Sequence, residues 1–246
     1  ALAYNPADGY MYAAHNADHN VSVASNDVLR IHADGSLEVA YTATFVSNTN
    51  LKGGAFAPDG TFYGIGANAG GNDKLVVISG LSDAPGVAAT MNTINLSQVV
   101  NMGDVVYDHT TNTLFAVSNL TNLLYSINTT TGAVTTVSTG APNGAGVDIG
   151  PNGIGSLYMT STGVLMGYIN GNAAGTEGQL VRINKTNGVL TLSKVGPITR
   201  DSDATSCVPS AYVLDVVKSV GDVSSASATQ FTVPYTVRVA NLGSLA

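Results

Sequence analysis

The sequence has 246 residues, of which 44% are hydrophobic and only 10% are charged, and its formal net charge is −7. Typical domains are about a quarter charged, so hydroxyl and amide side chains supply most of the polar surface here, which is typical of an extracellular protein. The acidic balance excludes the basic patch that nucleic acid or an anionic membrane surface requires. No stretch approaches the roughly 20 apolar residues of a membrane-spanning helix.

One phrase recurs along the chain: a short apolar strand, a turn rich in Pro, Asp, Gly or Asn, and a second strand that ends in an aromatic residue. Its copies lie at residues 3–12, 55–63, 106–115 and 147–158. The closing aromatic residues are 51, 52 and 43 positions apart: Tyr12, Tyr63, Phe115 and Tyr158. Asp-Gly and Asn-Gly pairs permit the positive φ angles that tight hairpins need, so each copy predicts an antiparallel hairpin.

A second phrase follows each first one and contains an isoleucine at the end of an apolar strand. These isoleucines are 47, 49 and 56 positions apart: Ile31, Ile78, Ile127 and Ile183. Two independent markers therefore share one period of about 50 residues. Helical spacing of apolar residues is nearly absent, and a short helical patch is plausible only between Leu81 and Val100.

About four β-like runs fit into each period, which is the pattern of a propeller blade. We therefore predict an all-β fold, a small β-propeller of four to five blades of four antiparallel strands with a C-terminal β-strand extension. Four copies are clear, and residues 201–207 stand where the inner strand of a fifth blade would begin. The propeller is expected to span residues 1–208.

The composition changes after Pro209, and residues 209–246 are expected to form a linker and a C-terminal strand segment. This segment contains a strand at residues 213–218, a Ser- and Ala-rich linker at 221–229 and an alternating strand at 231–241. Two strands do not make a stable domain alone, so the segment must pack on the propeller, belong to a truncated domain or donate a strand to another chain. The assembly strand would present these apolar residues: Phe231, Val233, Tyr235, Val237 and Val239.

The opening at residues 3–9 (AYNPADG), the Arg30-Ile31 pair and the closing motif at 203–207 (DATSC) carry a family resemblance. Residues 1–208 resemble a bacterial family of extracellular propeller-like repeats of unknown function (domain of unknown function 6923). Residues 234–243 are similar to the opening of Ig-like surface repeats (domain of unknown function 11). The resemblance implies a propeller followed by an Ig-like repeat, and it implies no catalytic residue.

Three clusters are weighed as metal sites. Residues 15–19 (HNADH) place two imidazoles and a carboxylate within five positions, but they lie among turn-forming residues, so a structural loop is preferred over a metal site. Residues 68–73, and Asp201 with Asp203, offer oxygen ligands, yet calcium takes six to eight oxygens. The sequence therefore predicts no metal and no cofactor.

No catalytic constellation is recognisable either, because no Ser or Cys has a base and an orienting group in a local pattern. The single cysteine, Cys207, is expected to be a buried apolar side chain or to pair with a residue outside this sequence. Five N-glycosylation sequons begin at Asn20, Asn95, Asn119, Asn128 and Asn184. Modification at these positions would fit an exposed, extracellular surface.

Two functions remain open from the sequence. The preferred one is a non-enzymatic structural or adhesion module of a bacterial cell-surface protein, which associates with itself as a homopolymer or with other domains of the same protein. Its sharpest version is a filament subunit that assembles by C-terminal strand donation. The alternative is a propeller that binds or cleaves carbohydrate, with tyrosines stacking on sugar rings and glycans as partners.

Overall fold

The computed structural model describes residues 2–14, 27–42, 50–67, 73–81, 88–118, 123–138, 143–150, 152–171, 177–199, 202–206, 214–220, 224–227, 230–232 and 235–241. The chain forms two compact units, Ala1–Val208 and Pro209–Ala246. The described ranges contain strands and turns and no helix, so none of their elements is a helix that could cross a membrane.

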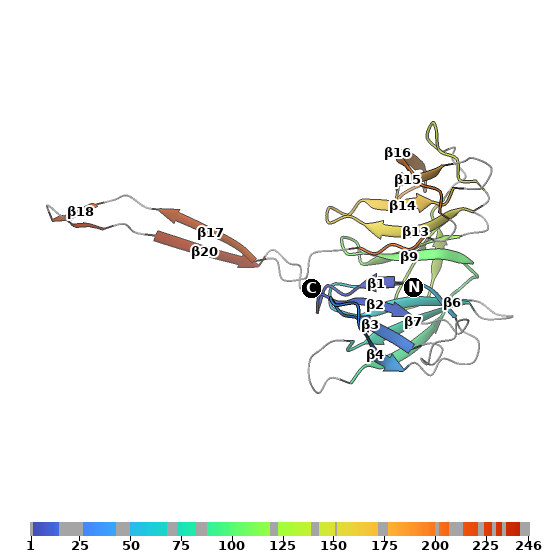
Figure 1. Cartoon of the computed structure of the whole chain (residues 1–246), viewed down its shortest axis with the longest axis horizontal. Coiled ribbons are helices and arrows are strands. Elements are labelled where there is room, and N and C mark those ends of the chain that lie inside the picture. The colour runs from blue at the N-terminus through green and yellow to red at the C-terminus, as the bar shows by residue number, and fades with distance from the viewer. Residues whose placement is uncertain are drawn as a thin grey trace. The chain divides into compact units, whose positions relative to one another are not determined.

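The first unit is a β-propeller of four blades, each an antiparallel four-stranded sheet with its strands in chain order (Figure 1). Blade 1 contains β1 (Leu2–Tyr4), β2 (Met11–Ala14), β3 (Asp27–Ile31) and β4 (Leu37–Thr42). Blade 2 contains β5 (Asn50–Phe56), β6 (Phe62–Ala67), β7 (Lys74–Ser79) and β8 (Thr90–Asn95). Blade 3 contains β9 (Met102–Asp108), β10 (Thr113–Ser118), β11 (Leu124–Ile127) and β12 (Val134–Thr136). Blade 4 contains β13 (Ile154–Met159), β14 (Leu165–Ile169), β15 (Gly178–Ile183) and β16 (Leu190–Gly196). The predicted all-β propeller is therefore confirmed, with four blades.

Tight turns join the first two strands of each blade, and their sequence explains the recurring phrase. In three of these turns a glycine takes a positive φ angle that a β-carbon would strain: Gly9, Gly60 and Gly163. In blade 3 Asn112 takes the corresponding place with φ at 53°, and asparagine tolerates this conformation better than most residues. The turn residues thus fix the hairpin register, and with it the position of each inner strand.

The hydrophobic core lies between the blades. One cluster joins blades 1 and 2, a second joins blades 2 and 3, and a third joins blades 3 and 4. Blades 2 and 3 are covered on both faces, and the second strand of blade 3 shows the effect most clearly. In β10, Leu114 through Val117 are all buried, as expected for a strand packed on both faces.

The register corrects the fourth copy of the first phrase. Tyr12, Tyr63 and Phe115 lie in the second strands, opposite Ala3, Ala55 and Val106. Tyr158 instead lies in the inner strand β13, where it pairs with Met166, and residues 147–150 are not a strand. The predicted copy at 147–158 is therefore displaced by one strand. Met166 holds the position of the closing aromatic residue, and the true spacings are 51, 52 and 51 positions.

The isoleucine marker holds in all four blades. Each isoleucine lies at the end of a third strand or one residue before it, and it pairs with the residue just before the closing position of the second strand. The helical patch, in contrast, is wrong over Thr90–Asn95, which forms the outer strand β8. Met91 and Ile94 of this strand are half-buried while the residues between them are exposed, a spacing that looks helical in the sequence.

The second unit contains two small antiparallel sheets in its described residues. β17 (Leu214–Val220) pairs with β20 (Tyr235–Asn241) over seven residue pairs, and β18 (Ser224–Ser227) pairs with β19 (Gln230–Thr232). The predicted continuous strand at 231–241 is thus divided between β19 and β20, and the predicted linker contains β18. We refer to the sheet of β17 and β20 as the C-terminal ribbon.

Candidate functional site

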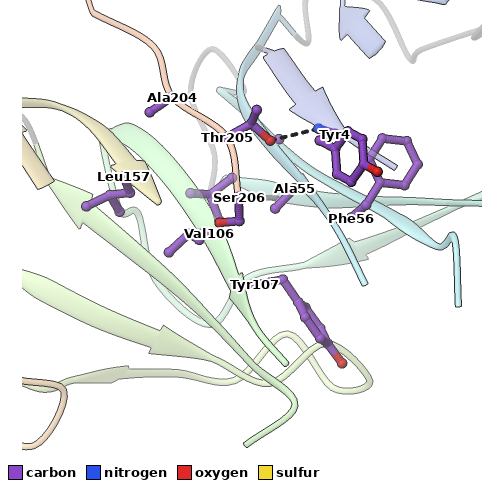
Figure 2. Close-up of a pocket in the computed structure, with 11 residues that line it drawn as sticks. Tyr4, Ala55, Phe56, Val106, Tyr107, Leu157, Ala204, Thr205 and Ser206 are labelled. Atoms are coloured by element: carbon purple, nitrogen blue, oxygen red, sulfur yellow. Dashed lines mark hydrogen bonds between the residues drawn. The ribbon is translucent and has the colours of Figure 1, made fainter. Parts of the chain in front are cut away.

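The central channel of the propeller, where ligands of such folds commonly lie, is lined by the four inner strands. β1 packs beside β5, β5 beside β9 and β9 beside β13. Among the described residues, β13 and β1 make no comparable contact, and residues 202–206 lie between them (Figure 2). This segment occupies the place expected for a fifth inner strand, but it is not a strand.

Hydroxyl side chains hold this segment in place. The Tyr4 N–H of β1 donates to Thr205 Oγ1 at 2.7 Å, and the Met159 N–H of β13 donates to Ser206 Oγ at 2.6 Å. Ser202 Oγ donates to Asn170 Oδ1 at 2.7 Å. We call residues 202–206 the closing segment, because these bonds join the last blade to the first without a β-ladder.

A buried carboxylate lies beside the closing segment. Asp104 of β9 accepts hydrogen bonds from the N–H groups of Val105 and Leu157, at 2.7 and 2.6 Å. The glycine at position 53 leaves room for it, because a β-carbon there would lie 3.0 Å from Asp104 Oδ1. Burial, and then the charge of Asp203, raise the pKa of Asp104 well above the usual carboxyl range. Asp104 therefore joins blades 3 and 4 and places a titratable group in the channel wall.

One cavity in the described part of the chain lies between the inner strands. The cavity between the inner strands and the closing segment measures about 10 Å³. Tyr4, Phe56 and Leu157 are among the residues that line it (Figure 2). This volume corresponds to about one water molecule, whereas small-molecule pockets span about 300–1,000 Å³. In this conformation the cavity is too small for an organic substrate.

A second carboxylate joins blades 3 and 4 at the end of the hairpin turns. Asp108 is fully buried, and Lys185 Nζ donates to Asp108 Oδ2 at 2.5 Å. Thr110 donates to Asp108 Oδ1 through both its N–H and its hydroxyl. Burial alone would raise the pKa of Asp108, but the bonds from Lys185 and Thr110 outweigh it and lower that pKa. Both oxygens of this carboxylate therefore accept hydrogen bonds from residues of the propeller.

Most of the residues weighed as metal ligands lie outside the described ranges: residues 15–19, 68–72 and Asp201. Asp73, the last member of the second cluster, is buried and accepts hydrogen bonds from the N–H groups of Val100 and Asn101. Asp203 accepts one from the Ala204 N–H. Within the described part of the chain, no three His, Cys, Asp or Glu side chains come together as a metal site.

Three of the five sequon asparagines are described, and all three are exposed: Asn95, Asn128 and Asn184. Asn128 and Asn184 begin equivalent turns in blades 3 and 4. Asn128 Oδ1 accepts hydrogen bonds from two backbone N–H groups of its turn, and Asn184 Oδ1 accepts one. Asn20, Asn119 and Cys207 lie outside the described residues.

The tyrosines that a carbohydrate site would use are divided between core and surface. Tyr12 is buried against Phe56, and burial, followed by its hydrogen bond to Asp8, raises its pKa to about 12. Tyr63 and Tyr107 stack with ring centroids 5.6 Å apart and an angle of 6° between planes. Burial, and then Tyr63, raise the pKa of Tyr107 to about 12. These rings stabilise contacts between blades.

The proposed assembly residues lie on both sheets of the second unit. Phe231 belongs to β19; Tyr235, Val237 and Val239 belong to β20; Val233 is not described. β20 pairs with β17 of the same chain, so the segment is not a lone strand. It instead offers the edges of a two-stranded ribbon, which carry unpaired backbone N–H and C=O groups.

The family model of a repeat of unknown function (DUF6923) matches residues 1–209. The chain belongs to this family. No curated protein matches the chain. Among solved structures, a streptogramin B lyase is 12% identical with a TM-score of 0.48, over 96% of this chain and 66% of the lyase, just under two thirds. A PQQ-bound aldose sugar dehydrogenase from Streptomyces coelicolor is 13% identical with a TM-score of 0.47, over 94% of this chain and 79% of that one. At these values neither neighbour's activity carries over.

The sequence alone does not indicate the roles of Asp104 or of the Lys185–Asp108 pair. The positions equivalent to Asp104 in blades 2 and 4 are occupied by Gly53 and Ser156. The repeat therefore does not predict a carboxylate at this position. Asp108 is recognisable as a turn residue, but the sequence does not indicate its cation, which is 77 positions away.

Proposed function

We propose that this DUF6923 protein is a non-enzymatic structural and adhesion module of a bacterial cell-surface protein, and that it associates with itself through its C-terminal strands. The observation that carries this proposal is the second unit, whose described strands form only two-stranded sheets. A two-stranded sheet is marginally stable in water, and its open edges can pair with a strand of another chain. Self-association would supply the missing partner.

The channel supports a non-enzymatic role. The cavity of about 10 Å³ is too small for an organic substrate, and the buried carboxylate of Asp104 accepts hydrogen bonds from two backbone N–H groups. General acid–base catalysis requires a group that can reach the substrate. Asp104 is 2% exposed and Asp108 is 0% exposed, so neither meets that requirement in this conformation.

The surface composition supports an extracellular setting. Only 10% of the residues are charged, and the described sequon asparagines are exposed where glycans could be attached. The similarity of residues 234–243 to the opening of Ig-like surface repeats agrees with a chain of modules on a cell surface.

Sedimentation and electron microscopy of the full chain test the proposal. We expect oligomers or fibres whose population rises with protein concentration, and we expect Val237→Asp in β20 to abolish them. Val195→Asp is the matched control, because Val195 is an exposed valine of unit 1, 43% exposed against 57% for Val237. Monomers at all concentrations would refute self-association, and equal effects of the two substitutions would refute the role of the ribbon.

A carbohydrate-binding or carbohydrate-cleaving propeller is the second candidate. Several tyrosines outside the core clusters are half-buried and leave part of the ring accessible to a sugar: Tyr4, Tyr158 and Tyr168. A glycan array and an assay of polysaccharide turnover separate the two candidates. Specific binding or cleavage would favour the second one.

A further inference from the structure

Each blade carries a row of three apolar residues, one each on its second, third and fourth strands, at a shared register. The row is Met11, Ile31 and Leu37 in blade 1; Phe62, Ile78 and Met91 in blade 2; Leu114, Ile127 and Val134 in blade 3; Leu165, Ile183 and Leu190 in blade 4. In blades 2, 3 and 4 the row belongs to the cluster shared with the preceding blade. The row is therefore a docking face for a neighbouring sheet.

Blade 1 has the same row, but no apolar cluster of the described residues joins it to blade 4. Ile31 is half-buried, whereas Ile78, Ile127 and Ile183 are 0%, 1% and 2% exposed. The difference in exposure between blade 1 and blade 4 is larger on the outer strand, where Leu37 is 61% exposed and Leu190 is only 3% exposed. Val39, two residues further along β4, is 47% exposed. We call Met11, Ile31, Leu37 and Val39 the uncovered face of blade 1.

The edge beside this face is open as well. β4 is the outermost strand of its sheet and pairs only with β3 among the described strands. Large apolar side chains exposed on an edge strand favour pairing with another chain. A partner that adds a strand to β4 would pair with this open edge and contact Leu37 and Val39 of the face.

We propose that the edge of β4, beside the uncovered face of blade 1, receives the C-terminal ribbon of a second copy of this chain. This inference rests on the proposed self-association and specifies its acceptor. The ribbon fits because a strand of seven residues matches the six of β4. Thr236, Val237 and Arg238 of β20 are all exposed and available for contact.

Charge complementarity favours β4 over the other three outer strands as the acceptor of β20. Glu38 lies between Leu37 and Val39, with half of its side chain exposed, and Arg238 lies beside the exposed Val237. Opposite charges and apolar pairs across neighbouring strands stabilise a sheet. The outer strand of blade 4 presents Lys194 beside its exposed valine, which would repel Arg238. β8 and β12 carry no charged residue.

Disulfide trapping between two differently tagged copies tests the acceptor. In a Cys207→Ser background, which removes the single native cysteine, Val39→Cys in one copy is mixed with Val237→Cys in the other and oxidised. We expect a mixed disulfide, because the bond requires Cα atoms within about 7 Å. The matched control replaces Val39→Cys by Val195→Cys on the outer strand of blade 4, and it should give at least tenfold less product.

Charge reversal provides a second test. Arg238→Glu should weaken self-association about two- to fivefold, the range of an exposed ion pair, and Glu38→Lys should do the same. The combination of both should restore it. Because Glu38 also contacts Arg30 and His32, Arg238→Glu is the cleaner single variant. Additive weakening in the combination would overturn the pairing.

The outcomes separate the two proposals. Association on sedimentation without the Val39–Val237 disulfide overturns the acceptor and leaves self-association standing. Monomers without any disulfide overturn both. If both cysteines are placed in one chain and only an intramolecular disulfide forms, the ribbon folds onto its own propeller, and the second copy is overturned as the occupant.

Discussion

Removal of the lysine that neutralises a buried carboxylate tests how blades 3 and 4 are held together. Lys185→Met keeps the length of the side chain and leaves Asp108 without its cation. Breaking a fully buried pair costs about 3–5 kcal/mol, and an unsatisfied buried acceptor about 1–3 kcal/mol. The Lys185 side chain is 28% exposed, so water can partly replace it. We therefore expect a loss of about 2 kcal/mol in the free energy of unfolding.

Thermal unfolding measures this loss. For a unit of this size, 1 kcal/mol corresponds to about 2–4 °C, so the Tm should fall by about 4–8 °C at pH 7. The pKa of Asp108 is lowered in the folded state, so the pair stabilises the fold above the unfolded carboxyl pKa of about 3.9. This stabilisation is lost as the pH falls through the folded pKa, and the difference between the two proteins should shrink below about pH 4.

Lys194→Met is the control, because Lys194 is exposed and makes no ion pair with the described residues. It should change the Tm by less than about 2 °C, in keeping with ordinary surface substitutions. The reasoning is refuted if Lys185→Met changes the Tm no more than the control does. It is also refuted if the loss persists unchanged at pH 2.

Two further predictions concern the channel and the turns. The pKa of Asp104 is raised in the folded state, so ionisation of this carboxyl opposes folding. The Tm should therefore decline as the pH rises above the usual carboxyl range. Asp203→Asn should make this decline smaller in thermal melts recorded at a series of pH values. Gly60→Ala should destabilise the protein more than Gly35→Ala in chemical unfolding. Both glycines have φ near +84°, which costs an L-residue about 1–2 kcal/mol. Only at Gly60 would the new methyl group meet a neighbour, the Ala7 β-carbon at 2.9 Å. Equal losses at the two positions would contradict the packing argument.

The repeat period of the sequence was sufficient to predict the fold, but it did not give the correct position of the fourth hairpin. Blades 1 and 2 repeat the Pro-Asp-Gly type of turn and end in tyrosine. The fourth hairpin turns through Thr160–Gly163 without proline or aspartate, and its closing position holds Met166. A Pro-Asn-Gly stretch at 151–153 resembles the phrase more closely than the true turn does. The similarity of local turn chemistry therefore pointed to the wrong hairpin.

The candidate site was less accessible to sequence reasoning than the fold. The sequence suggested the start of a fifth inner strand at residues 201–207, but residues 202–206 form no strand, and their hydrogen bonds to the blades use hydroxyl side chains. Such bonds leave no periodic signal. Asp104 is equally hidden, since its environment is made by Gly53 and Leu157 from two other blades. These contacts between blades are made by residues that differ from one blade to the next, so the repeat period does not reveal them.

The closing segment also determines how the propeller responds to tension. It is the last described part of unit 1, so a pull on the C-terminal side of the chain reaches Ser206 and Thr205 before it reaches any blade. Three hydroxyl hydrogen bonds hold the segment against that load, whereas each blade is held by β-ladders. The ring should therefore open at low force between blades 4 and 1 while the four sheets stay folded, and the cavity of about 10 Å³ would widen on stretching.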